Sequence, residues 1–74
     1  MNEHDTVVLT RALADFGLEA GDTGAIVHVY EDMAAYVVEF IRGDGTTVAI
    51  ATLTSADIRP LSAGEVLHVR SLVA

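Results

Sequence analysis

The sequence predicts an all-β fold, a small barrel of five strands followed by an extra apolar C-terminal strand or arm. Turn signals divide the chain into short apolar runs, which is the pattern of an all-β domain. These runs are rich in β-branched residues, which favour strands. Hydrophobic residues make up 51% of the 74 residues, which is enough for one core and argues against disorder.

The first strand is expected at residues 6–9, where three β-branched residues precede a leucine. The spacing of Leu9, Leu13 and Phe16 also fits a helix over residues 5–18. A strand followed by a long loop is preferred, because the β-branched residues open this stretch and a glycine closes it.

Glycine-rich turns then separate the remaining strands. A tight turn is predicted at residues 21–24, where two glycines allow a positive φ on either side of Asp22 and Thr23, and a second turn at residues 43–45. A hairpin loop at 31–34 and one helical turn at 55–57 complete the connections. The strands between them are expected at residues 25–30, opened by Gly24, and at 36–41, 46–53 and 58–61, the last containing Pro60. Because Gly24 starts a strand directly after a turn, it should need a positive φ or unusually close packing.

The core is expected to consist mainly of Val, Ile and Leu, because the chain has only two Phe and two Tyr. Side chains alternate along a strand, so Tyr36, Val38 and Phe40 should share one face, with Phe40 buried. Several strands nevertheless carry apolar residues on both faces. That pattern indicates a covered outer face or an oligomer.

The predicted barrel spans residues 1–62, and residues 63–74 continue beyond it as an apolar segment. His68 and Arg70 alternate with Leu67 and Val69 as in a strand. Such a segment should add a strand to its own barrel or cross to a second copy of the chain. A homodimer is predicted, with residues 64–73 supplying much of the contact.

The charge of the chain limits its partners. Eleven acidic residues against four arginines give a net charge of −7, which repels nucleic acids and anionic membranes and attracts basic proteins. The N-terminus has no basic start and no apolar run of a secretory signal. The apolar runs fall well short of the ~20 residues of a membrane helix. The cytoplasm is therefore the expected location.

No set of residues in the sequence predicts catalysis or a cofactor. The chain has no cysteine, and its histidines, His4, His28 and His68, lie in three separate segments without the spacing of a zinc site. The acidic residues fall mostly in turns, where short carboxylates serve turn geometry. The chain is therefore not expected to be an enzyme or to bind a metal.

Arginine is enriched in protein interfaces, which makes Arg59 a candidate anchor. The alternative is a structural ion pair of Arg59 with Asp57 or Glu39. The candidate interface combines the apolar C-terminal segment with two side chains outside it and comprises Val66, Leu67, Val69, Arg70, Leu72, Arg59 and Tyr30.

The order of these signals, with a long first loop and a helical turn before the last strand, is similar to that of SH3-like barrels. Residues 21–27 resemble the turn and strand that open KOW and related translation-type barrels. The run from Asp5 to Leu61 more closely resembles one bacterial family, domain of unknown function 4926. The likeness rests on residues 5–9, 17–18, 20–24, 27–30, 35–36, 38–40 and 57–61.

That resemblance implies a fold and carries no activity with it. The leading hypothesis is a protein-interaction module, either an accessory subunit or an antitoxin-like binder of another protein. The alternative is a KOW-type nucleic-acid-binding barrel, which rests on the fold and is opposed by the charge.

Overall fold

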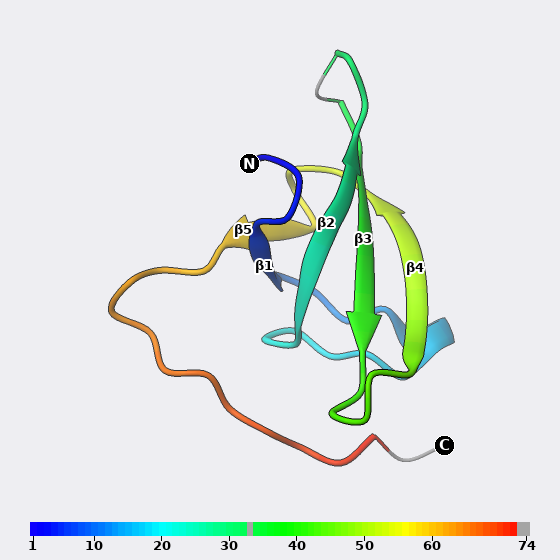
Figure 1. The fold of residues 1–74 in the computed structure, drawn as a ribbon, viewed down its shortest axis with the longest axis vertical. Helices are drawn as coiled ribbons and strands as arrows, with labels where there is room; N and C mark the ends of the chain where they lie inside the picture. Colours follow the sequence, from blue (N-terminus) through cyan, green and yellow to red (C-terminus); the bar gives the residue numbers. More distant parts are fainter. Residues whose placement is uncertain (33, 73–74) are drawn as a thin grey trace.

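Five antiparallel strands form one curled sheet (Figure 1). The computed structural model describes residues 1–32 and 34–72, so Met33 of the predicted hairpin loop and Val73 and Ala74 of the predicted apolar segment lie outside the described residues. The sheet order is β4-β3-β2-β1-β5. The strands are β1 (Thr6–Leu9), β2 (Thr23–Val29), β3 (Tyr36–Ile41), β4 (Thr47–Leu53) and β5 (Ile58–Pro60). The all-β prediction is confirmed, and the fold is an SH3-like barrel left open between β4 and β5.

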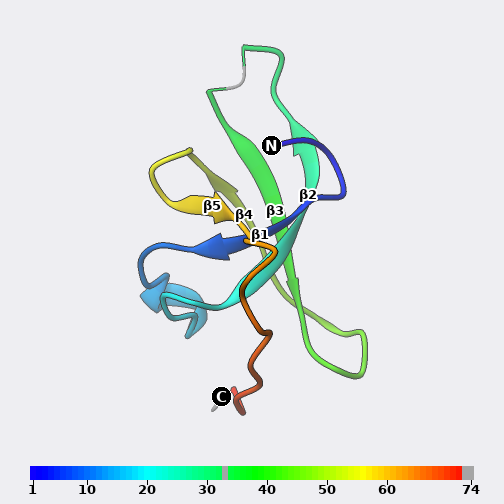
Figure 2. The ribbon, with the colours of Figure 1, turned by 90° about the vertical axis from the view of Figure 1, so that its left-hand side faces the viewer.

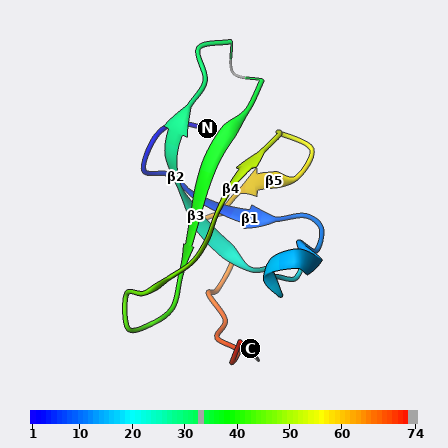
Figure 3. The same ribbon diagram turned by 90° about the vertical axis from the view of Figure 1, so that its right-hand side faces the viewer.

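The stretch after β1 is a loop, as predicted, and not a helix. It contains one short 3-10 helix, η1 (Ala14–Phe16), and it is closed by a bridge between Leu13 and Leu18 (Figure 3). Gly17 ends the 3-10 helix with a φ of 71°, a left-handed conformation that glycine adopts without strain. Of the three residues with helical spacing, Leu9 belongs to β1, Leu13 enters the core from the loop and Phe16 is exposed, so the spacing does not mark one buried helical face.

The turn before β2 is correctly predicted at Gly21, which has a φ of 95°. Gly24 was expected to be the other turn glycine, but it lies inside β2, without a positive φ, opposite Val7 of β1. A Cβ atom at Gly24 would lie 2.7 Å from Cγ1 of Val38 and 2.9 Å from Cε1 of Phe40. Close packing across the barrel therefore requires glycine at this position.

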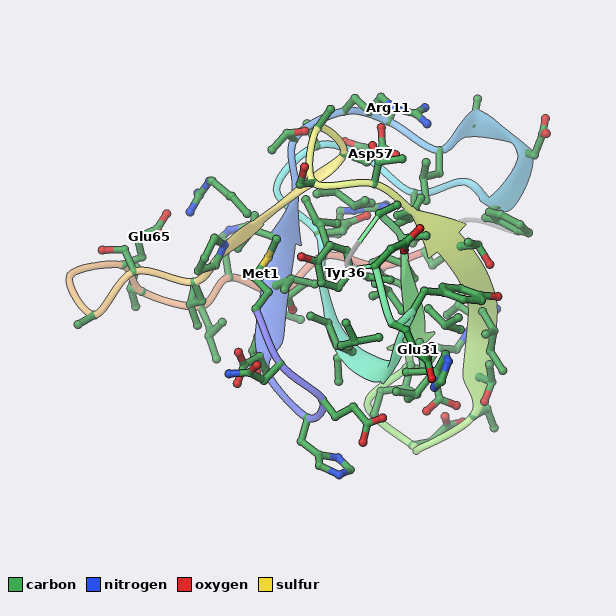
Figure 4. The ribbon with its side chains drawn as sticks, turned by 90° about the horizontal axis from the view of Figure 1, so that it is seen from above. Met1, Arg11, Glu31, Tyr36, Asp57 and Glu65 are labelled. Atoms are coloured by element: carbon green, nitrogen blue, oxygen red, sulfur yellow. The ribbon has the colours of Figure 1, made fainter. Side chains whose placement is uncertain are left out.

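Residues 55–57 form a hydrogen-bonded turn and not a helical one. The Asp57 N–H donates to the Thr54 carbonyl oxygen at 3.0 Å, and the Thr54 N–H donates back to the Asp57 carboxylate at 3.0 Å. The same carboxylate accepts a hydrogen bond from Nε of Arg11 at 2.6 Å, and Figure 4 shows Arg11 beside Asp57. The Asp57 carboxylate is thus paired with Arg11, and the predicted ion pair between Asp57 and Arg59 does not form.

The core lies between the curled halves of the sheet. Tyr36, Val38 and Phe40 are all buried, which confirms the predicted face of β3. No polar or charged side chain is buried among the described residues. Other members come from every strand and from the β1–β2 loop, namely Val7, Leu9, Leu13, Leu18, Ile26, Ala49, Ala51, Leu53 and Ile58.

The outer face of the sheet explains why the apolar alternation is imperfect. The pairing of β2 with β3 shifts register between Ile26 and His28, and a bulge of this kind leaves Val27 exposed. Ile41 of β3 and Ile50 of β4 also point outward, with 60% and 58% of their surfaces exposed. The barrel is therefore too small to bury all of its apolar residues.

The C-terminal segment is an arm and not a strand over its described part. We define the arm as residues 63–72; Figures 1 and 2 show it running outside the barrel, below β1 and β5. After the Glu65 N–H donates to the Ser62 carbonyl oxygen, no backbone group of residues 66–72 bonds to another backbone group in the part of the chain described. The turn at 62–65 directs the chain away from the sheet, so no strand can form beside β5. Within the described ranges, no helix is long and apolar enough to cross a membrane.

Candidate protein-interaction surface

The base of the arm is fixed by a bidentate ion pair. Nη1 and Nη2 of Arg59 donate to the two carboxylate oxygens of Glu65 at 2.7 and 2.6 Å, and the Ser62 N–H donates to the same carboxylate at 2.8 Å. These contacts, the arginine above all, lower the pKa of Glu65 to about 2. Figure 4 shows Glu65 where the arm swings out from the barrel. The partner of Arg59 is therefore Glu65 and not Asp57 or Glu39, whose carboxylate accepts the Thr47 hydroxyl instead.

The far end of the arm is fixed by Arg70, whose guanidinium returns to the β1–β2 loop. Nε and Nη2 of Arg70 donate to the two carboxylate oxygens of Asp22 at 2.9 and 2.5 Å, and Nη2 also donates to the Gly17 carbonyl oxygen at 3.0 Å. Nη1 lies 3.3 Å from a carboxylate oxygen of Glu19. The Arg70 hydrogen bonds are the main reason that the pKa of Asp22 is lowered. One arginine thus joins the arm to a loop almost fifty residues earlier in the chain.

Leu72 adds an apolar contact beside this ion pair. It is half-buried, and its Cδ1 atom lies 3.5 Å from the position that a Cβ atom of Gly17 would occupy. Gly17 therefore offers its carbonyl oxygen to Arg70 and its open Cα surface to Leu72. Gly17 thus contacts both Arg70 and Leu72 at the end of the arm.

Between the two ion pairs, the arm exposes its apolar side chains to solvent. Val66 is 91% exposed, Leu67 63% and Val69 89%. Single exposed apolar residues are ordinary, but three within four consecutive positions of one ordered segment form a local patch. This part of the arm has the composition of a contact surface.

A groove separates the end of the arm from the barrel. It has a volume of about 500 Å³ and is bounded by residues 68–72 of the arm, the β1–β2 loop and the start of the β3–β4 hairpin. Its apolar lining is formed by Leu18, Phe40, Ile41, Val48, Val69 and Leu72. Arg42 and His68 supply polar groups at the same site. The groove joins Ile41 of the outer sheet face to the patch on the arm.

The structure brings together six of the seven predicted interface residues, since Arg59 lies at the base of the arm and the other five belong to it. Tyr30 lies at the opposite end of the molecule, in the β2–β3 connection (Figure 1). There it packs edge to face with His28, with ring centroids 5.1 Å apart. Tyr30 is therefore not part of the arm surface.

Sequence reasoning did not identify the loop residues that receive the arm. Asp22 was expected to be a turn residue only, and Glu19 and Gly17 were not singled out as contacts. Glu65 follows Arg59 by six residues, and this short separation was the one available signal for their pair. Over residues 1–32 and 34–72, no group of three or more His, Asp or Glu could hold a metal ion.

The architecture and the arm define the chain as a small SH3-like barrel domain with an added C-terminal arm. A family model described as "Domain of unknown function (DUF4926)" matches residues 3–60, and the chain belongs to this family. No curated protein and no solved structure matches the chain. The matched residues end at Pro60, the last residue of β5, so the family model covers the barrel and not the arm.

Proposed function

We propose that this chain is a cytoplasmic protein-interaction module, an accessory subunit or an antitoxin-like binder, without catalytic activity or a cofactor. One observation carries the proposal. The arm is fixed at both ends by arginine–carboxylate pairs, while the apolar side chains between them remain exposed. Ordering a segment costs conformational entropy, and an ordered apolar patch gains most free energy when a partner covers it. The arm and its groove are the proposed contact surface.

The charges support a protein partner with a basic surface. Three of the four arginines are already bound to carboxylates, Arg11 to Asp57, Arg59 to Glu65 and Arg70 to Asp22. Nucleic-acid affinity depends on arginine and lysine side chains that are free to neutralise phosphates. The KOW-type alternative therefore has the fold in its favour and the electrostatics against it.

The two exposed isoleucines of the sheet provide a matched test. Ile41→Asp places a charge in the groove, whereas Ile50→Asp places the same charge at an equally exposed position on the next strand, away from the groove lining. Each variant and the parent chain would be immobilised and used to capture proteins from the cells that produce them. We expect one partner to be retained by the parent and by Ile50→Asp, and to be lost with Ile41→Asp.

Nucleic-acid binding is measured beside this capture, with labelled single- and double-stranded nucleic acid at low salt. No binding is expected. Tight binding that weakens steeply with added salt, or a captured partner that is insensitive to Ile41→Asp, would contradict the proposal.

A further inference from the structure

We propose that two copies of this chain pair through their arms, which form a two-stranded antiparallel ribbon about a two-fold axis. This inference rests on the proposed function, because it uses the exposed side of the same arm, and it names a second copy as the occupant of that side. Apart from Val69, the residues that line the groove lie outside this contact and stay available to another partner.

The arm offers an unpaired backbone. Backbone N–H and C=O groups are strong hydrogen-bonding groups, and those of residues 66–72 have no backbone partner in the structure over its described residues. The Arg70 side chain and Leu72 tie this stretch to the β1–β2 loop. An ordered segment with free backbone groups is a template for strand addition.

The side chains of the arm alternate in a way that suits a strand. At the end of the arm, Arg70 and Leu72 contact the β1–β2 loop, whereas Leu67 and Val69, which have the other parity, are exposed, and Val66 and His68 are exposed as well. Successive side chains of a strand point to opposite sides, so one side of the arm is committed to the barrel and the other is available. Pairing two arms would place these valines and leucines against their symmetry mates.

The distribution of charge along the chain favours the arm as the contact between two acidic molecules. All eleven acidic residues precede residue 66, together with Arg11, Arg42 and Arg59, whereas the charged side chain after that point is Arg70. Two barrels repel each other, whereas the carboxylates nearest the arm, those of Glu65, Asp22 and Glu19, are paired with Arg59 and Arg70. An arm-to-arm contact about a two-fold axis is also isologous, because the same residues of both copies meet in it.

The contact is small, and the dimer should be weak. Seven residues per chain bury less than the ~800 Å² per partner of a standard interface, so a dissociation constant on the order of 10–100 µM is expected. In sedimentation equilibrium, the mass should rise from the 7.8 kDa of one chain toward that of two as the concentration increases through this range. Leu67→Asp, at an exposed arm position outside the groove lining, should weaken the dimer at least tenfold, whereas Ile50→Asp should leave it within about twofold of the parent.

Cysteine crosslinking tests the symmetry, because the chain has no cysteine of its own. Cysteine is introduced singly at Val66, Leu67, His68 and Val69, with Ile50→Cys as the control, and each variant is oxidised at equal concentration. A disulfide needs Cα atoms about 4.4–6.8 Å apart, which a symmetric ribbon provides only at positions next to its axis. One or two neighbouring arm positions should therefore form a disulfide dimer at least tenfold faster than Ile50→Cys.

The dimer is overturned if the parent chain sediments as a single copy at every concentration, or if no arm position crosslinks faster than Ile50→Cys. A mass that grows beyond two copies would also overturn it, because it would indicate arm-to-edge pairing that does not close. None of these results depends on the groove. The Ile41→Asp capture experiment therefore tests the proposed function separately from the dimer.

Discussion

The barrel and the arm of this protein are held in place by different forces. In the barrel, apolar side chains from all five strands are buried together, and the described residues include no buried polar side chain. The arm has no strand pairing and depends on two arginine–carboxylate pairs and one half-buried leucine. Apolar burial is insensitive to pH and moderate salt, whereas partly exposed ion pairs respond to both. The arm can therefore be released under conditions that leave the barrel folded.

The largest effect is expected from Phe40→Ala, which tests the barrel side of this comparison. Phe40 is 2% exposed, and removing a buried phenylalanine costs about 3–5 kcal/mol of unfolding free energy. So small a domain has little more stability than that, so the variant should be largely unfolded. Thermal and urea unfolding followed by circular dichroism measure it, with Phe16→Ala as the control, since Phe16 is 44% exposed. Equal stability of the two variants would show that the core is elsewhere.

A smaller loss is expected from Gly24→Ala. The added methyl group would lie 2.7 Å from Cγ1 of Val38 and 2.9 Å from the Glu39 carbonyl oxygen, so the sheet must move to admit it. Overpacking of this kind costs roughly 1–3 kcal/mol. Gly43→Ala is the matched control, because a Cβ atom there would meet nothing within 4 Å. Urea midpoints that are equal for the two variants would contradict the close approach of β2 and β3.

Arg70→Ala should separate the two regions. The substitution removes the hydrogen bonds to Asp22 and Gly17, so the arm should become mobile while the unfolding midpoint of the barrel stays near that of the parent. NMR order parameters of amides 66–72 should fall below ~0.6, the range of flexible backbone. Arg42→Ala, which leaves the arm contacts intact, should keep the parent values. A loss of stability comparable to that of Phe40→Ala would mean that the arm is part of the core.

Lowering the pH should have the smallest effect of these tests, and it should weaken the ion pairs of Asp22 with Arg70 and of Glu65 with Arg59. The pKa values of Asp22 and Glu65 are lowered from their ordinary values of 3.8 and 4.5, and that of Glu65 reaches about 2. A carboxyl group with a lowered pKa stabilises the folded form above its ordinary pKa, and this contribution is lost as the pH falls through the lowered value. The Glu65 contact at the base of the arm should hold from neutral pH to about pH 4 and be lost as the pH approaches 2, and the Asp22 contact at its far end should be lost below the ordinary pKa of that carboxyl group. Amide chemical shifts of the arm, followed against pH, would detect detachment; a transition near pH 6 would contradict it.

The sequence predicted the strands well because their signals are local. Runs of β-branched residues and glycine turns placed β1 and β3 at their observed bounds and the other strands within one or two residues. For Gly24 the sequence predicted either a positive φ or unusually close packing, and the structure shows the close packing. The two causes could not be separated in advance, because a glycine required by a neighbouring strand looks the same in sequence as one required by its own backbone.

The arm was harder to predict because its contacts are distant in sequence. Arg70 reaches Asp22 across almost fifty residues, and no periodicity in the sequence records such a pair. The apolar character of residues 66–69 was visible, but an apolar run with alternating polar residues predicts a strand whether or not an edge is available. Several carboxylates lie close to Arg59 in the sequence, so its partner could not be predicted. In the structure Asp57 pairs with Arg11, and Arg59 pairs with Glu65.

The short strand β5 has a consequence for how this protein behaves when it is crowded. Hydrogen bonds from Leu61 N–H to the Thr6 carbonyl oxygen and from Thr10 N–H to the Asp57 carbonyl oxygen flank its pairing with β1. Antiparallel alternation then turns the nitrogen of Pro60, opposite Val7, toward the open side of the sheet. A proline there has no N–H to offer, so an incoming strand finds a three-residue edge with a missing donor. Pro60 therefore hinders the edge-to-edge pairing of barrels that leads to fibrils.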